Sequence, residues 1–252
     1  VNKIAVFDAD QIGAGLLSTT LNVQGWAGLS QVVQINALGG TLDLSGWTFS
    51  TWDAIIDGEF EPGRDVVFVA GSGVTDNVIG STTGDRIEGD DGDDVISGGA
   101  GADSLDGGAG LDQLSGGAGN DFLELYSDEF VAGEVLDGGA DTDLLYITFA
   151  GATSVDFRTS TVTGFERLEF NTAYNSATPI FAVFNAAQVG PGLSTSLEVI
   201  GSTSIDVVTI IATSATSLDL SAWTFNFWTG GGFADIVVFN QSSGNDSFIG
   251  TS

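Results

Sequence analysis

The 252-residue chain contains no histidine, no cysteine and no methionine. Without cysteine and histidine it has no disulfide framework, no Cys/His zinc site and no usual haem ligand. The Ser-His-Asp and Cys-His nucleophilic mechanisms are excluded as well, because both need a histidine. Chemistry in this chain therefore has to rely on oxygen ligands and carboxylates.

Positive charge is nearly as scarce, with 5 Lys and Arg against 34 Asp and Glu and a formal net charge of −29. Such a chain repels the phosphates of nucleic acids and the surface of anionic membranes. No stretch reaches the roughly 18 apolar residues of a membrane span. We therefore expect neither a nucleic-acid partner nor direct membrane insertion, and a bound divalent cation would explain how the acids are neutralised.

High acidity is often a sign of disorder, but the apolar content argues against it here. Hydrophobic residues make up 42% of the chain and aromatic residues 10%, including 17 Phe and 5 Trp. A disordered acidic chain is poor in both classes. We therefore expect a folded protein with a substantial core.

A nine-residue repeat fills positions 71–124, which divide into six consecutive rows. The first position of every row is Gly, and the eighth is Val, Ile or Leu. The sixth is Asp in all six rows: Asp76, Asp85, Asp94, Asp103, Asp112 and Asp121. Similar rows recur at 138–146 and, in degenerate form, at 241–249. A fixed phase of Asp and aliphatic residues is not expected of a flexible glycine linker.

Each row predicts a turn followed by a short strand. Glycines at the start supply positive φ, and the three residues after them form a strand with one apolar side chain turned inward. Two rows then make one coil of 18 residues, and stacked coils place each Asp beside the Asp 18 residues away, as with Asp85 and Asp103. Two carboxylates and several turn carbonyls give an all-oxygen cage, which suits Ca²⁺ better than Mg²⁺ or Zn²⁺.

The sequence GGAGADSLDGGAGLDQLSGGAGNDFLE at 98–124 resembles the RTX (repeats-in-toxin) family of secreted bacterial calcium-binding proteins. The resemblance implies an all-β fold, a right-handed parallel β-roll or β-solenoid with several Ca²⁺ ions bound in the turns. It implies that each ion is held by two Asp side chains, by the carbonyls of positions one and three of one loop, and by those of positions two and four of the next.

The resemblance assigns metal ligands residue by residue. In the loops that fit best it gives Gly89, Asp91, Asp94, Gly98, Gly99, Ala100, Gly101, Asp103, Gly107, Gly108, Ala109, Gly110, Asp112, Gly116, Gly117, Ala118, Gly119 and Asp121. Asp76 and Asp85 are added from loops that depart from the pattern, because Val74 and Thr83 replace the fourth-position Gly. A spacer-like stretch at 127–143 adds Asp137 and Asp143, and the degenerate row adds Asp246.

A longer repeat relates the two ends of the chain. The segment LDLSGWTFSTW at 42–52 matches LDLSAWTFNFW at 218–228, so that Trp47 and Trp52 recur as Trp223 and Trp228. Residues 1–82 recur in this way as 178–252. The organisation we expect is a β-solenoid flank at 1–70, the nonapeptide roll at 71–124, a spacer and β-rich module at 125–177, and the second copy at 178–252.

The flanks predict β-structure as well. Short β-rich runs at 32–35, 41–44 and 65–68 are broken by Gly and Ser, and 165–170 alternates apolar and polar residues as a half-buried strand does. One capped helical turn is expected at 7–12.

These features favour a non-catalytic, Ca²⁺-dependent structural segment of a large secreted RTX protein. The resemblance implies type I secretion and an extracellular or cell-surface location, as an adhesin, a surface layer or a matrix component. Two alternatives stay open: an accessory module of a secreted hydrolase or epimerase, and a glycan-binding module using the repeated Trp pairs. We expect further nonapeptides after Ser252 and end-to-end association of copies in Ca²⁺.

Overall fold

The computed structural model describes residues 3–12, 21–24, 31–50, 66–150, 152–172, 179–202, 205–214, 216–226, 236–242 and 247–249. In this part of the chain every strand pair with an assigned register is parallel. Its helical segments are three 3₁₀ turns: η1 (Ala9–Gln11), η2 (Phe157–Thr159) and η3 (Ala186–Gln188). None of them approaches the length that a membrane crossing needs. The predicted all-β parallel architecture is confirmed.

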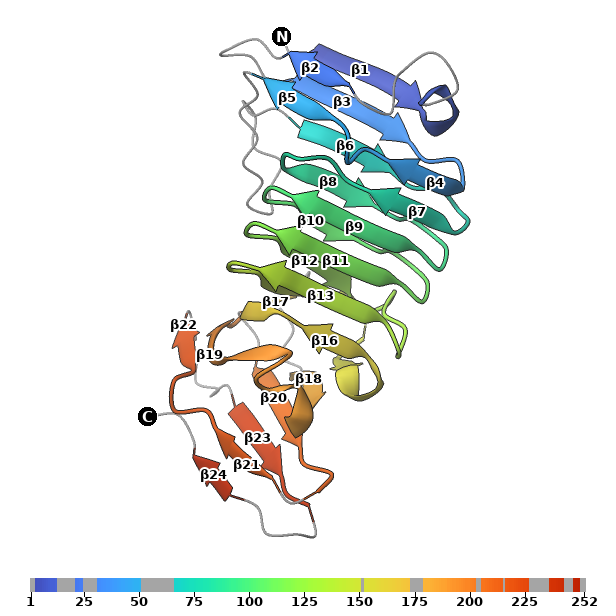
Figure 1. The fold of residues 1–252 in the computed structure, drawn as a ribbon. Helices are drawn as coiled ribbons and strands as arrows, with labels where there is room; N and C mark the ends of the chain where they lie inside the picture. Colours follow the sequence, from blue (N-terminus) through green and yellow to red (C-terminus); the bar gives the residue numbers. More distant parts are fainter. Residues whose placement is uncertain are drawn as a thin grey trace. The chain divides into compact units, whose positions relative to one another are not determined.

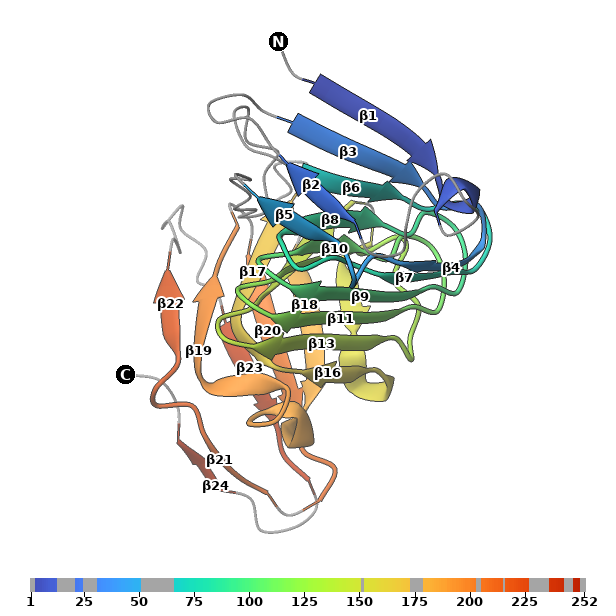
Figure 2. The ribbon, with the colours of Figure 1, turned by 45° about the horizontal axis from the view of Figure 1, so that its top comes forward.

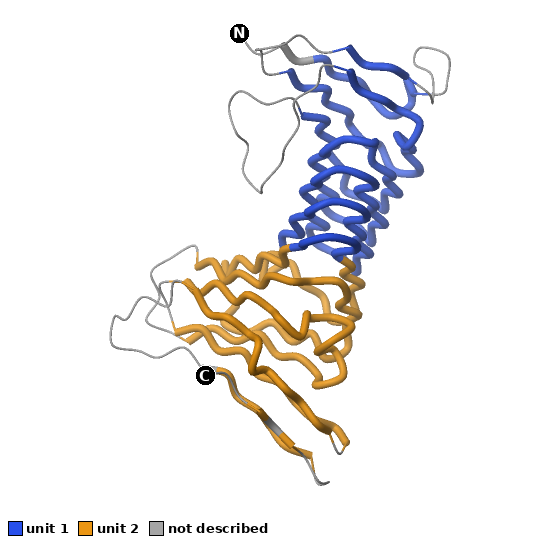
Figure 3. Tube along the Cα trace, turned by 60° about the vertical axis from the view of Figure 1, so that its left-hand side comes forward, with its two compact units in different colours: residues 1–124, 138–143 blue, residues 125–137, 144–252 orange. Residues whose placement is uncertain are grey.

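The chain divides into two compact units, coloured separately in Figure 3. Unit 1 contains residues 1–124 and 138–143, and unit 2 contains residues 125–137 and 144–252. Strands β12 (Phe122–Tyr126) and β13 (Val135–Ala140) each contribute residues to both units.

Unit 1 has two main layers, which Figure 2 shows one behind the other. The first contains, in spatial order, β1 (Lys3–Asp8), β3 (Gln31–Asn36), β6 (Val66–Ala70), β8 (Asp85–Glu88), β10 (Ser104–Asp106) and β12. The second contains β4 (Gly40–Asp43), β7 (Asp76–Ile79), β9 (Val95–Ala100), β11 (Gln113–Ala118) and the end of β13. A separate pair joins β2 (Asn22–Gln24) to β5 (Thr48–Ser50).

The nonapeptide block forms the predicted 18-residue coils, stacked one after another in Figure 1. Leu105 lies opposite Ile87 and Leu123 in the first layer, and Ile96 lies opposite Leu114 in the second. These side chains are at most 3% exposed. The eighth position of every row therefore fills the interior, and burial of these aliphatic side chains holds the two layers together.

Unit 2 is built from longer parallel coils. One layer contains β14 (Leu144–Phe149), β17 (Phe165–Thr172), β19 (Leu193–Ile200) and β22 (Thr224–Asn226). Another contains β15 (Ser154–Asp156), β18 (Ile180–Asn185), β20 (Asp206–Ile211) and β23 (Ile236–Asn240). Shorter pairs join β13 to β16 (Thr161–Thr163) and β21 (Ser217–Asp219) to β24 (Ser247–Ile249). Aromatic side chains contribute to this core beside the aliphatic ones, and Phe157, Phe165, Phe170 and Phe184 are at most 2% exposed.

The two sequence copies share local structures at matching positions that are described in both. The capped turn predicted at 7–12 is η1, preceded by the end of β1, and its counterpart in the second copy is η3. Trp47 and Trp223 are both buried, and their backbone N–H groups donate to the carbonyls of Leu44 and Leu220 at 2.8 and 3.0 Å. The long repeat is therefore structural. The buried indoles pack in the core instead of offering a glycan platform, while Trp52 and Trp228 lie outside the described residues.

Candidate metal centre

The sixth-position aspartates form two columns, one along each edge of the stacked coils. In four of them the backbone N–H donates to the Oδ1 atom of the Asp 18 residues later. These hydrogen bonds join Asp76 to Asp94, Asp85 to Asp103, Asp94 to Asp112 and Asp103 to Asp121, at 2.7–2.8 Å. The predicted neighbours 18 residues apart are thus adjacent in the structure.

In three of these carboxylates the second oxygen, Oδ2, is available to a metal ion. The columns are buried, with exposures of 0–2% for all six aspartates. Yet the Oδ2 atoms of Asp94, Asp103 and Asp121 have no hydrogen-bond partner. Burying an ionised carboxylate that has no partner lowers the stability of the fold by roughly several kcal/mol, because the ion loses its hydration. Such oxygen atoms fit a bound cation.

The first-position glycines show where these oxygens converge. A Cβ atom on Gly89 would lie 2.4 Å from Asp94 Oδ2 and 2.4 Å from the carbonyl oxygen of Gly107, one coil further on. Gly116 has the same surroundings, with Asp121 Oδ2 and the Gly138 carbonyl each 2.4 Å from such a Cβ. A carboxylate oxygen and a carbonyl oxygen of the next coil therefore face the same point, and a side chain there would fill it.

Electrostatics in the columns work against ionisation when no cation is bound. Burial raises the pKa of Asp94 to about 6, and repulsion by Asp112 and Asp76 adds to this effect. Burial likewise raises the pKa of Asp121 to about 6. The pKa of Asp103 is raised by burial and by the charge of Asp85, and that of Asp85 is raised by burial. A divalent cation would reverse this trend and keep the carboxylates ionised at neutral pH.

Asp76 and Asp85, at the start of the columns, are satisfied within the chain. Ser81 donates its backbone N–H to Asp85 Oδ2 at 2.6 Å and its hydroxyl to Oδ1 at 3.0 Å. Ser72 donates both groups to Asp76 Oδ2 at 2.9 Å. We call this arrangement, a serine four residues before an aspartate, the serine clasp. The serine takes the place of the second-position Gly. It occupies both oxygens of Asp85 and Oδ2 of Asp76, whose Oδ1 accepts the N–H of Gly39 at 2.9 Å.

Sequence reasoning missed the clasp, although the pattern Gly-Ser-x-x-x-Asp was visible. The same pattern at 201–206 forms a third clasp in unit 2, where Ser202 donates its backbone N–H and its hydroxyl to the buried carboxylate of Asp206. The predicted metal ligands did not include Asp206.

The remaining predicted ligands lie in different environments. Asp143 extends one column, because its Oδ1 accepts the N–H of Asp121 at 2.8 Å. Asp137 lies on β13 and accepts the hydroxyl of Thr163 at 2.8 Å. Asp91 is exposed in its loop and forms a bridge with Ala109. Asp246 lies outside the described residues.

Backbone carbonyls would have to complete any cation site in the columns. Within the described ranges no three or more Asp or Glu side chains gather into a metal-binding group. Glycines at the second and fourth loop positions adopt positive φ, such as +105° at Gly99 and +126° at Gly101, so the loops turn tightly. A set of oxygens from few carboxylates and many carbonyls suits Ca²⁺, which accepts six to eight oxygen ligands in irregular geometry.

Comparison with known proteins identifies the block. Residues 71–105, 79–114 and 88–123 match the family model of the RTX calcium-binding nonapeptide repeat. No curated protein and no solved structure matches the chain. The segment 71–123 is therefore a run of RTX calcium-binding repeats, several Ca²⁺ ions are its cofactor, and it forms a calcium-binding structural module.

Proposed function

We propose that the chain is a non-catalytic, Ca²⁺-dependent structural segment of a large secreted protein, of the adhesin, surface-layer or matrix kind. Low Ca²⁺ inside the cell would leave the block unfolded and ready for export, and Ca²⁺ outside would fold it. The ligands we propose are the column carboxylates from Asp94 onward, with the loop carbonyls 89–92, 98–101, 107–110 and 116–119.

The buried columns of carboxylates are the observation that carries this proposal. Asp94, Asp103 and Asp121 each keep an oxygen without a hydrogen bond, in a chain with a net charge of −29. Without cations the columns repel themselves, and ligation of Ca²⁺ appears directly as folding free energy. An extended coil stack with a continuous core serves as a spacer or scaffold.

Far-ultraviolet circular dichroism of the full chain tests calcium-dependent folding. In EGTA we expect a largely unfolded nonapeptide block, and in a few millimolar Ca²⁺ a gain of β signal. Mg²⁺ at the same concentration is the matched control, because it demands near-octahedral geometry and dehydrates reluctantly. An unchanged spectrum on Ca²⁺ addition, or an equal response to Mg²⁺, would contradict the proposal.

The length and neighbours of the parent gene distinguish the structural role from the accessory-module alternative. A scaffold predicts further copies of the long repeat that relates residues 1–82 to residues 178–252, while a secreted hydrolase or epimerase predicts an adjacent catalytic domain. A glycan array tests the third candidate. Buried Trp47 and Trp223 leave only Trp52 and Trp228 of the repeated pairs for that role.

A further inference from the structure

Two equivalent strand–turn segments of the sequence copies differ in what covers them. We call residues 5–12, with β1 and η1, the first corner, and the corresponding residues 182–189, with β18 and η3, the second corner. Inside unit 2 the second corner is covered by the preceding coil, which contains β15 and η2. The described residues contain no strand that pairs with the outer edge of β1.

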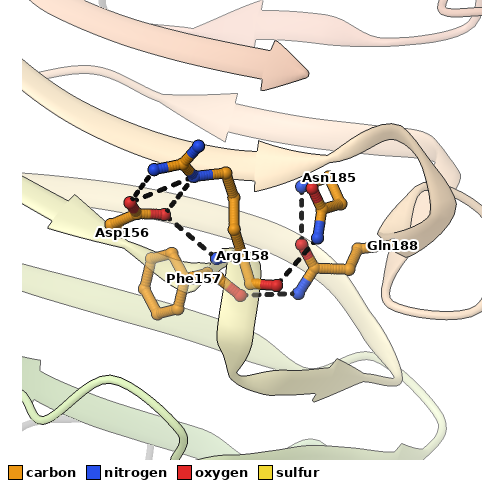
Figure 4. A network of polar contacts seen from close by, with 5 residues as sticks. All are labelled: Asp156, Phe157, Arg158, Asn185 and Gln188. Atoms are coloured by element: carbon orange, nitrogen blue, oxygen red, sulfur yellow. Dashed lines mark hydrogen bonds and ion pairs between the residues drawn. The ribbon is translucent and has the colours of Figure 1, made fainter. Parts of the chain in front are cut away.

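The covering coil makes specific contacts with the second corner (Figure 4). The ring of Phe157 stacks on that of Phe184, with centroids 4.8 Å apart and planes 7° from parallel. Gln188 Nε2 donates to the carbonyl oxygens of Phe157 at 3.0 Å and Ser160 at 3.1 Å. Asn185 Nδ2 donates to the carbonyl oxygen of Arg158 at 2.7 Å.

The strands continue the same interface. β15 pairs with β18 in parallel, with Val155 opposite Ala182, and Phe181 N–H donates to the carbonyl oxygen of Thr153 at 2.8 Å. Ala182 and Phe184 are fully buried as a result. Main-chain hydrogen bonds and an aromatic stack thus together hold the coil of β15 and η2 against the coil of β18 and η3.

The first corner keeps the same internal geometry without its cover. Gln11 Oε1 accepts the N–H of Asp8 at 2.8 Å, as Gln188 Oε1 accepts that of Asn185 at 2.7 Å. Ala5, the counterpart of fully buried Ala182, is exposed, and Phe7, the counterpart of fully buried Phe184, is only half-buried. The corner therefore presents an open strand edge, an aromatic ring and an oriented amide.

We infer that the outer face of β1 and η1 is a docking surface for a further copy of the coil at 152–172, placed in line before β1. The occupant follows from the chain itself, because the second copy shows which segment covers the equivalent corner. Phe7 would stack on the aromatic ring of that coil, and Gln11 Nε2 would donate to its carbonyls. One contact differs, since the carboxylate of Asp8 replaces the donating amide of Asn185. This surface lies outside the nonapeptide block, so the inference stands independently of calcium-dependent folding.

A fusion tests the inference. Residues 152–177 are duplicated directly before Val1 of the full chain, which reproduces the natural spacing because Thr178 follows residue 177 and aligns with Val1. Hydrogen exchange is measured in Ca²⁺ for the amide of Ile4, the counterpart of Phe181, and for that of Val6. We expect exchange of both amides to slow at least tenfold relative to the unfused chain, because an edge strand gains a partner.

Two variants separate docking from a general effect of the added residues. Phe157→Ala in the duplicated segment alone, and Gln11→Ala in the fused chain, should each remove much of the added protection. Gln11→Ala is also measured in the unfused chain, so that the effect of losing its hydrogen bond from the N–H of Asp8 is subtracted. Equal exchange in fused and unfused chains, or protection that survives both variants, would overturn the inference. Protection of the unfused chain that disappears on dilution would assign the surface to a second molecule and overturn the in-line arrangement.

Discussion

The two carboxylate oxygens of Asp94, Asp103 and Asp121 have separate tasks. In each of them Oδ1 accepts the backbone N–H of an aspartate in the preceding coil, while Oδ2 lacks a hydrogen-bond partner. The first is a structural hydrogen bond, and the second is available to a cation. Substitutions that keep one oxygen and change the other can therefore separate folding from metal binding.

Asp103→Asn keeps an acceptor for the N–H of Asp85 and removes a charge. We expect Ca²⁺ affinity to fall at least tenfold, which corresponds to about 1.4 kcal/mol. Without Ca²⁺ the metal-free fold should form more readily at neutral pH, because burial and the charge of Asp85 raise the pKa of Asp103 to about 9, and Asn removes the cost of protonating this carboxylate on folding. Calcium titrations followed by circular dichroism measure both effects. Asp43→Asn is the control, since Asp43 is exposed outside the block, and an equal loss of affinity in that variant would refute the assignment.

The serine clasp predicts a stability effect without a metal effect. Ser81→Ala removes the hydroxyl donor to the buried carboxylate of Asp85, and we expect the unfolding free energy in Ca²⁺ to drop by about 1–3 kcal/mol. Ser45→Ala is matched to it, because that hydroxyl also donates to an aspartate, Asp43, but on the exposed surface; its loss should cost about 0.5 kcal/mol or less. Urea unfolding gives both values. Similar losses in the two variants would show that burial of the clasp has no special role.

At the scale of the turn, two non-glycine residues, Asp90 and Asp141, adopt the positive φ that favours glycine. Asp90 has φ +72°, at the loop position where Gly99, Gly108 and Gly117 have φ of +105°, +79° and +110°. L-residues pay roughly 1–2 kcal/mol for left-handed backbone, with Asp among the more tolerant. We expect Asp90→Gly to raise the unfolding free energy in Ca²⁺ by about 0.5–1 kcal/mol.

For the neighbouring residue, Asp91, we expect a glycine substitution to have the opposite effect on stability. Asp91 is not among the residues with positive φ, so Asp91→Gly only increases the freedom of the unfolded chain and should lower stability by about 0.5–1 kcal/mol. Chemical denaturation of both variants checks the difference in sign. A stabilising Asp91→Gly, or a destabilising Asp90→Gly, would show that φ at this turn does not control the outcome.

At the scale of the whole molecule, proton binding and calcium binding should oppose one another. Burial raises the folded-state pKa of Asp94 and Asp121 to about 6, above the ordinary value of about 3.9 in an unfolded chain. Their contribution to stability is therefore fully present below about pH 4 and is lost as pH rises through about 6. The calcium-free chain should lose on the order of 1 kcal/mol or more per group between pH 4 and pH 7.

Calcium should invert this dependence, because ligation needs ionised carboxylates and protons compete with the metal. From pH 4 to pH 8 the far-ultraviolet β signal of the calcium-depleted chain should fall, while the urea midpoint in millimolar Ca²⁺ should rise. A β signal that rises with pH in calcium-depleted buffer would mean that the columns are not desolvated carboxylates.

The sequence alone determined the 18-residue coil of the nonapeptide block and the aspartates that form its two columns. A period of nine with Asp at position six and an aliphatic residue at position eight leaves one consistent arrangement, because the Asp side chains have to lie at the turns and the aliphatic ones inside. Asp103 and Leu105 could therefore be assigned in advance. Repetition also predicted that residues near both ends share a structure, which Trp47 and Trp223 bear out.

Only the tertiary structure decided which carboxylates are satisfied by the chain and which are left for a cation. Asp85 and Asp103 share one position of the repeat, yet a serine hydroxyl four residues earlier reaches the first, while the second keeps an unpartnered oxygen. The structure alone also showed that Phe184 is sealed by Phe157 while its counterpart Phe7 is half-exposed. Hydrogen-bond partners and coverage depend on segments brought together by stacking, and a local pattern does not contain them.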